Sequence, residues 1–210
     1  PDAEISLESN PGTISLDKLS QYKLAGFNRL SIGLQSTIED ELKEIGRIHT
    51  FQEFLTGYEN ARKAGFTNIN IDIMSALPGQ TLDTYLKTLS RVVELRPEHI
   101  SAYSLIIEEG TVFWERYHDD KNTSFPALPS EETERFMYEK TDEVLRQYGY
   151  QRYEISNYAI PGRECIHNSV YWERKNYVGF GLGAASLYEN NRWKNTGKMQ
   201  EYLTEPTKKL

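Results

Sequence analysis

Hydrophobic side chains recur along the chain with two different periods. In some segments they return every third or fourth residue, which is typical of helices, and in others they fall on every second residue, which is typical of half-buried strands. Helices are expected at 15–25, 37–45, 51–64, 82–95 and 131–148, and strands at 4–9, 29–35, 68–74, 99–107 and 151–158. This alternation of helix and strand predicts an α/β fold with a parallel sheet.

The ends of the expected helices carry capping residues. Four N-terminal caps are expected, at Ser36, Thr50, Thr81 and Ser130. The first two are followed three residues later by a glutamate, which is the spacing of a capping box. Three helices end at a glycine, the residue that most easily takes the left-handed backbone closing a helix, at Gly26, Gly65 and Gly149.

One face of each expected strand is polar. In 68–74 the isoleucines share one face, because side chains alternate along a strand, and the other face carries Asn68, Asn70, Asp72 and Met74. In 29–35 the second face carries Ser31, Gly33 and Gln35. A closed eight-stranded barrel would have an aliphatic interior, and a doubly wound sheet would be apolar on both faces. The pattern favours an open barrel with a polar, ligand-filled interior, while the alternative that these residues only satisfy one another stays open.

Charged and amide side chains lie at or near the carboxyl ends of these strands, where α/β folds of this kind bind their ligands. They are Glu8, Gln35 and Asp72, and Arg47 follows in the loop after the short helix expected at 37–45. These four residues are the candidate binding set.

Composition narrows the function classes. The formal net charge is −7, which argues against non-specific nucleic-acid binding. A single cysteine excludes a disulfide framework and a self-contained cysteine-ligated metal site. No apolar run approaches the length of a membrane span, and no signal-peptide pattern opens the chain, so the cytoplasm is the expected compartment. The chain begins with Pro1 rather than methionine, and we expect it to be a piece of a longer protein.

The C-terminal part of the chain is rich in aromatic residues. Within it, the segment 165–172 (CIHNSVYW) places His167 close to Tyr171 and Trp172. A histidine beside aromatic rings can be an axial heme ligand, and a histidine bonded within the fold is the alternative interpretation. A zinc site is not expected, because no second ligand pair follows. The run 179–184 (GFGLGA) matches a dinucleotide fingerprint only formally, and we expect close backbone packing there instead.

Taken in order, the motifs of this chain resemble those of the radical SAM family of oxygen-independent coproporphyrinogen III oxidase-like proteins. The resemblance extends over nearly the whole chain and is carried by SLESNPG (6–12), GFNRLSIGLQS (26–36), GRIHT (46–50), AGFTNINIDIMSALPGQT (64–81), PEHISAYSLIIEEGT (97–111), YEISNYAIPGRECIHNSVYW (153–172) and YVGFGLGAAS (177–186). The HNxxYW pattern at 167–172 is similar to the heme chaperone branch of this family.

The resemblance implies a fold and a set of binding residues. The implied fold is a parallel sheet in a partial (β/α)6 TIM-like barrel, truncated at its N-terminus and occupying 1–125, followed at 126–210 by a smaller α+β, aromatic-rich C-terminal extension. S-adenosylmethionine would lie across the strand ends. The implied contacts to this cofactor are Glu8, Gln35, Arg47 and Asp72, with Met74 and Ile106 as apolar neighbours, and the implied heme ligand is His167.

The chain also departs from the family pattern. The CxxxCxxC motif that binds the family's [4Fe-4S] cluster would lie upstream of Pro1, and Cys165 cannot replace three thiolates. Ala185 stands where a histidine is common, so any role of that histidine is absent. This chain is therefore expected to hold no cluster and to be inactive by itself.

The resemblance implies a function and, with it, an alternative. The implied function is a heme-binding chaperone that delivers heme to respiratory enzymes, with heme and a respiratory heme-protein recipient as partners. The alternative is an oxygen-independent coproporphyrinogen III oxidase, which converts two propionates to vinyls on a porphyrinogen substrate. A third interpretation is another βα-barrel enzyme whose motifs match by chance.

Overall fold

The computed structural model describes residues 2–119 and 124–205, and the chain forms two compact units, Pro1–Glu164 and Cys165–Leu210. The helices of the first unit are α1 (Leu16–Leu24), α2 (Glu39–Glu44), α3 (Phe51–Lys63), α4 (Leu82–Glu94), α5 (Val112–Tyr117) and α6 (Glu131–Gln147). Its strands are β1 (Ser6–Ser9), β2 (Arg29–Gln35), β3 (Ile69–Ser75), β4 (His99–Ser104), β5 (Gln151–Arg152) and β6 (Asn157–Ala159).

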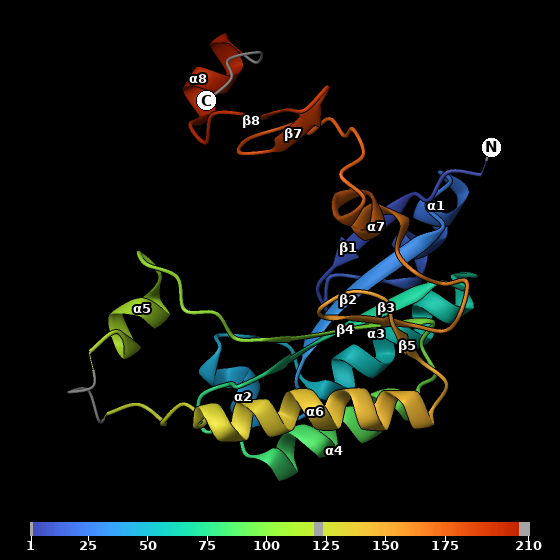
Figure 1. The fold of residues 1–210 in the computed structure, drawn as a ribbon. Coiled ribbons are helices and arrows are strands. Elements are labelled where there is room, and N and C mark those ends of the chain that lie inside the picture. The colour runs from blue at the N-terminus through green and yellow to red at the C-terminus, as the bar shows by residue number, and fades with distance from the viewer. Residues whose placement is uncertain (1, 120–123, 206–210) are drawn as a thin grey trace. The chain divides into compact units, whose positions relative to one another are not determined.

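The strands of the first unit form one sheet in the order β1-β2-β3-β4-β6-β5 (Figure 1). Strands β1 to β4 are parallel to their neighbours, and β6 is antiparallel to both β4 and β5. The α/β class with a mostly parallel sheet is therefore confirmed. The register places Glu8 opposite Ser31, and Asp72 opposite both Gly33 and Ser101, so the polar residues of adjacent strands stand side by side.

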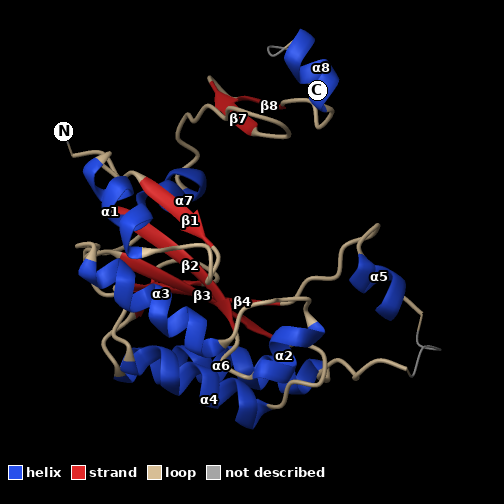
Figure 2. Cartoon of the chain, turned by 180° about the vertical axis from the view of Figure 1, so that it is seen from behind, coloured by secondary structure: helices blue, strands red, loops and turns tan. Residues whose placement is uncertain are grey.

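The aliphatic face of the sheet is the core of this unit. Its side chains are fully buried, and they are Leu30, Ile32, Leu34, Ile69, Ile71, Ile73 and Ile100. They pack against buried residues of four helices, with Leu19 from α1, Phe54 from α3, Leu89 from α4 and Met137 from α6. Figure 2 shows these helices along one side of the sheet. The period-two pattern thus predicted correctly which side chains face the helices and which are left for the other face.

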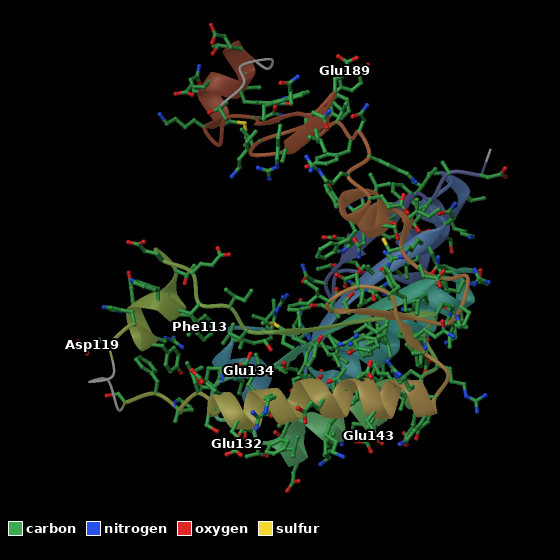
Figure 3. The ribbon with its side chains drawn as sticks, in the orientation of Figure 1. Phe113, Asp119, Glu132, Glu134, Glu143 and Glu189 are labelled. Carbon is green, nitrogen blue, oxygen red and sulfur yellow. The ribbon has the colours of Figure 1, made fainter. Side chains whose placement is uncertain are left out.

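Most of the expected helix caps are present. Thr50 accepts from the backbone of Glu53, whose side chain accepts from the backbone of Thr50, as the capping box requires. The side-chain oxygen of Thr81 accepts from the backbone of Thr84 at the start of α4, and that of Ser130 accepts from the backbone of Thr133 at the start of α6. Acidic residues follow in the first turn of α6, among them Glu132 and Glu134 in Figure 3, where they favour the positive end of the helix dipole.

The expected cap at Ser36 is wrong. Helix α2 begins instead after Ile38, which makes no side-chain cap bond. The Ser36 hydroxyl donates to the carboxylate of Glu41 at 2.5 Å, and the Gln80 amide donates to the same carboxylate at 3.0 Å. Thr84 donates to its other oxygen at 2.5 Å. Glu41 is 5% exposed, so the serine hydroxyl donates to a buried carboxyl group, and its oxygen accepts from the backbone of Ile38 rather than from the first turn of α2.

The strand expected at 151–158 is also wrong as a single strand. Residues 153–156 interrupt it, and its two halves, β5 and β6, pair with each other in antiparallel fashion. A hairpin within one short segment has the same alternating pattern as one strand, so periodicity could not separate them. Helix α5, which Thr111 caps, was not expected.

The second unit contains α7 (Ile166–Trp172), β7 (Ala185–Tyr188), β8 (Asn191–Lys194) and α8 (Met199–Thr204). Strands β7 and β8 form a hairpin whose two turn residues, Glu189 and Asn190, have positive φ angles of 49° and 63°. A Cβ on Gly179 would lie 2.3 Å from the carbonyl oxygen of Ala185, which agrees with the close backbone packing expected in GFGLGA. The predicted division into 1–125 and 126–210 does not coincide with the two compact units, because α6 packs on α4 within the first unit. The division into a barrel and a C-terminal extension stays a prediction.

Candidate functional site

Asp72 is the central carboxylate of the polar face. Its Oδ1 accepts from Asn70 Nδ2 at 2.7 Å, and its Oδ2 accepts from Ser31 Oγ at 3.1 Å. Burial raises the pKa of Asp72; hydrogen bonds from Asn70, Ser101 and Ser31 lower it in part, and the nearby charge of Glu8 raises it. The carboxylate is thus held in one orientation by Asn70 on its own strand and by Ser31 on the adjacent strand β2.

Asn70 connects this carboxylate by hydrogen bonds to His99, the first residue of β4. Besides Asp72, its amide nitrogen donates to Ser31 Oγ at 2.7 Å, and its Oδ1 accepts from Ser101 Oγ at 3.1 Å and from His99 Nδ1 at 2.6 Å. All four hydrogen-bonding positions of the amide are therefore used. Because Nδ1 donates, the neutral His99 ring accepts at Nε2 from the Tyr153 hydroxyl at 2.8 Å. Burial, together with the positive charge of Arg29, lowers the pKa of His99 to about 3.

Gln35 ends β2 with an unusual backbone. Its φ is +71°, and the register with β3 is irregular between Gly33 and Gln35. This turns the side chain back over Gly33, where an added Cβ would lie 2.9 Å from Gln35 Nε2. The hydroxyl of Tyr103 donates to Gln35 Oε1 at 3.1 Å. Glycine at position 33 therefore leaves the space that the amide occupies.

Arg47 reaches the same end of the sheet from the loop between α2 and α3. Its Nη1 donates to Asn10 Oδ1 at 2.7 Å, just after β1. The charges of Asp72, Arg47 and Glu8 all act on the Tyr103 hydroxyl, and burial together with Asp72 raises the pKa of Tyr103 to about 12. The structure thus brings the four expected binding residues together around Tyr103.

The two apolar residues of the expected set differ in their surroundings. Met74 is half-buried on β3, opposite Tyr103. Ile106 is 77% exposed and lies two residues beyond the end of β4. The role of both as neighbours of the adenosyl group stays a prediction.

His167 belongs to the second unit. It lies in α7 with an exposed side chain, and its ring packs edge-on against Tyr171, with 4.8 Å between ring centres. Tyr171 in turn packs against Tyr177 at 4.5 Å. The imidazole therefore stands at the end of a row of aromatic rings, and its role as a heme ligand stays a prediction.

The candidate binding set predicted from the sequence leaves out five further residues of the site. They are Asn10, Ser31, Asn70, Ser101 and Tyr103. Four of them could be assigned to the polar face by alternation alone, but their bonds to Asp72 and Gln35 depend on the register between strands. Asn10 follows a strand and had no periodic signal.

The polar strand ends fit S-adenosylmethionine, whereas nothing described in this chain fits an iron–sulfur cluster. Two carboxylates and a guanidinium match the ammonium, hydroxyl and carboxylate groups of that cofactor, and the glycine beneath Gln35 leaves the amide room. The chain has one cysteine, and the described residues contain no group of three His, Cys, Asp or Glu that could hold a metal ion. Nor does any helix among the described residues have the length and apolarity needed to cross a membrane.

Residues 1–92 match the family model of the radical SAM superfamily. The sheet of the first unit is mostly parallel, as the sequence pattern predicted. This part of the chain is therefore similar to the radical SAM superfamily, a name that implies S-adenosylmethionine and a [4Fe-4S] cluster.

Within this superfamily the sequence is similar to the heme chaperone HemW of two bacteria. It is 39% identical to that of Lactococcus lactis over 98% of this chain and 54% of the relative, and 40% identical to that of Bacillus subtilis over 96% and 52%. The chain thus spans about half the length of the curated relatives it matches.

The fold is also similar to that of a solved structure, the coproporphyrinogen III oxidase HemN of Escherichia coli. The TM-score is 0.81 at 28% sequence identity, and the match covers 97% of this chain and 49% of that chain. This similarity confirms the expected TIM-like partial barrel.

Proposed function

We propose that this chain is the S-adenosylmethionine-facing part of a heme chaperone of the radical SAM superfamily. The observation that carries the proposal is the cluster of Glu8, Gln35, Arg47 and Asp72 at one end of the sheet, in a chain that matches heme chaperones over nearly its whole length. In this assignment Arg47 pairs with the carboxylate of the cofactor, and Glu8 and Asp72 accept hydrogen bonds from its ammonium and ribose hydroxyls.

Binding of S-adenosylmethionine tests this assignment directly. Isothermal titration of the wild-type chain is compared with Asp72→Asn and with Asp83→Asn, which changes an exposed acid in the first turn of α4. We expect Asp72→Asn to weaken binding at least tenfold, because an amide replaces an acceptor that two neighbours hold in place, and Asp83→Asn to bind like wild type. Equal affinity of all three proteins would show that the cofactor does not use this edge.

In a longer protein, a [4Fe-4S] cluster would supply the electron for reductive cleavage of the sulfonium. Because the described residues of this chain do not fit a cluster, its thiolates would have to come from elsewhere in a longer protein. Anaerobic reconstitution of this chain with iron and sulfide should give no iron–sulfur absorbance. Its appearance would contradict the assignment of the ligands.

Heme binding is proposed for the second unit through His167. Heme is titrated into the wild-type chain, into His167→Ala and into His118→Ala, since His118 is another exposed histidine stacked on an aromatic ring, that of Trp114. We expect only His167→Ala to lose the shifted Soret band of ligated heme. Identical spectra for all three proteins would exclude His167 as the ligand. Transfer to a respiratory heme protein belongs to the same proposal.

A second candidate function is oxygen-independent coproporphyrinogen III oxidation. One observation favours it, the structural similarity to HemN at a TM-score of 0.81. The test is anaerobic incubation of the longer, cluster-loaded protein with coproporphyrinogen III. Formation of protoporphyrinogen would favour the oxidase, and cleavage of the cofactor without that product would favour the chaperone.

A further inference from the structure

The amide of Gln35 has one end bonded and one end open. Its Oε1 accepts from Tyr103 at 3.1 Å, whereas its Nε2 makes no hydrogen bond to any residue that the structure describes. The residue is only 3% exposed. The nitrogen is not among the fully buried side-chain atoms without a partner, so its N–H groups are accessible at the candidate site and can donate to water or to a ligand.

The Gln35 side-chain nitrogen lies over Gly33. The point at which a Cβ of Gly33 would stand is 2.9 Å from Gln35 Nε2, 3.8 Å from Asn10 Oδ1 and 3.9 Å from the backbone oxygen of Ser9. Asn10 Oδ1 is an acceptor, because it receives a bond from Arg47.

The Tyr103 hydroxyl supports the same orientation. Burial and the negative charge of Asp72 raise its pKa to about 12, so the phenol keeps its proton at any pH at which the protein is handled. A protonated phenol donates to Gln35 Oε1, and this leaves the nitrogen on the opposite side of the amide. The hydrogen bond from Tyr103 on β4 is therefore the contact that orients the Gln35 amide.

We propose that Tyr103 is a positioning residue, which holds the Gln35 amide so that its N–H groups face the bound ligand. The ligand atom that meets Gln35 is then a hydrogen-bond acceptor, such as a carboxylate, ribose or ring-nitrogen atom of S-adenosylmethionine. This inference rests on the proposed function for the identity of the ligand, but the orientation of the amide can be measured without it.

Two substitutions test the inference by binding. Tyr103→Phe removes only the hydroxyl. We expect it to weaken S-adenosylmethionine binding about tenfold, because the loss of one hydrogen bond changes an affinity by about that factor. Gln35→Glu replaces the donor by a second acceptor, and we expect a larger loss. The matched control is Tyr58→Phe, which removes a hydroxyl bonded to Leu95 and Arg62 at the other end of the sheet. It should leave the affinity unchanged.

The amide itself gives a spectroscopic readout. In protein labelled with ¹⁵N at the side chains of glutamine, the Gln35 amide should give one pair of resonances in wild type and in Tyr58→Phe. In Tyr103→Phe the pair should shift and broaden or double, because the amide can then flip. A purely structural role of the hydroxyl would lower the melting temperature and leave these resonances as one pair.

The outcomes separate the two proposals. If S-adenosylmethionine binds and Tyr103→Phe neither weakens it nor changes the amide resonances, the positioning role is refuted. Binding of Gln35→Glu as tight as wild type would refute the acceptor identity of the ligand atom. If wild type does not bind S-adenosylmethionine at all, the proposed function fails, and the resonances alone decide the role of Tyr103.

Discussion

Protonation of His99 should make this protein sensitive to mild acid. The ring is fully buried, and burial together with the positive charge of Arg29 lowers its pKa to about 3 from an ordinary value of 6.5. Below pH 6.5 the His99 ring is protonated in the unfolded chain but stays neutral in the folded chain. The free energy of unfolding therefore falls as the pH falls. The perturbation is a change from pH 7 to pH 4.5.

The expected size follows from the two pKa values. Each pH unit between them costs about 1.4 kcal/mol, so this histidine alone should remove about 3 kcal/mol of stability by pH 4.5, and at most about 5 kcal/mol at lower pH. Asp72 acts in the opposite direction, because a raised folded-state pKa means that the folded chain takes up its proton first as the pH falls. The effect of His99 must therefore be read as a difference between variants.

The assay is urea denaturation followed by circular dichroism at both pH values, for wild type, His99→Gln and His118→Gln. His99→Gln should lose less stability than wild type between pH 7 and pH 4.5, by about 3 kcal/mol, even though it is less stable than wild type at pH 7. His118 is exposed, so His118→Gln should lose as much as wild type. An equal loss in all three proteins would refute the argument that His99 is buried in its neutral form.

Three further predictions concern the framework around the site. Thr50→Ala should lower the free energy of unfolding by about 1 kcal/mol in urea, because it removes half of a capping box, and an unchanged midpoint would contradict that role. Gly179→Ala should lower the hydrogen-exchange protection of the β7–β8 hairpin, because the new Cβ would lie 2.3 Å from the Ala185 carbonyl oxygen. Gly197→Ala is the control, since the space around Gly197 is open, and it should leave the protection unchanged. Equal protection in both variants would count against this packing. Glu41→Leu should cost about 3 kcal/mol in urea, because it leaves two hydroxyls and an amide without their acceptor, and a cost below 1 kcal/mol would mean that water replaces the carboxylate.

The parts of the fold that local patterns determine were predicted from the sequence. Alternation in β2 and β3 placed Gln35 and Asp72 on the polar face, and the cap residues located the starts of α3, α4 and α6. Of the candidate site, Gln35 contacts Tyr103, and the charges of Glu8, Arg47 and Asp72 act on the same hydroxyl; the role of the four residues as a binding set stays a prediction.

The remaining features depend on contacts between distant segments. Ser36 has the local pattern of a helix cap, but its hydroxyl donates to the buried carboxylate of Glu41 instead. The link between Tyr103 and Gln35 depends on the register across three strands and on a left-handed residue at a strand end, neither of which periodicity contains. The hairpin of β5 and β6 is another case, because alternation is the same in one strand and in two.

The hydrogen bonds of the polar face join residues that are far apart in the chain. During synthesis on the ribosome, the site can therefore form only after the later of the two partners has been made. Ser31 and Asp72 are 41 residues apart, and Gln35 and Tyr103 are 68 apart. At a synthesis rate of about 5–20 residues per second, Gln35 leaves the peptidyl-transferase centre roughly 3–14 s before Tyr103 is made. A nascent chain that ends before β4 therefore has Asp72 and Gln35 but not the groups that orient Gln35. If the proposed function holds, the oriented Gln35 amide becomes available to the cofactor only after β4 has been translated.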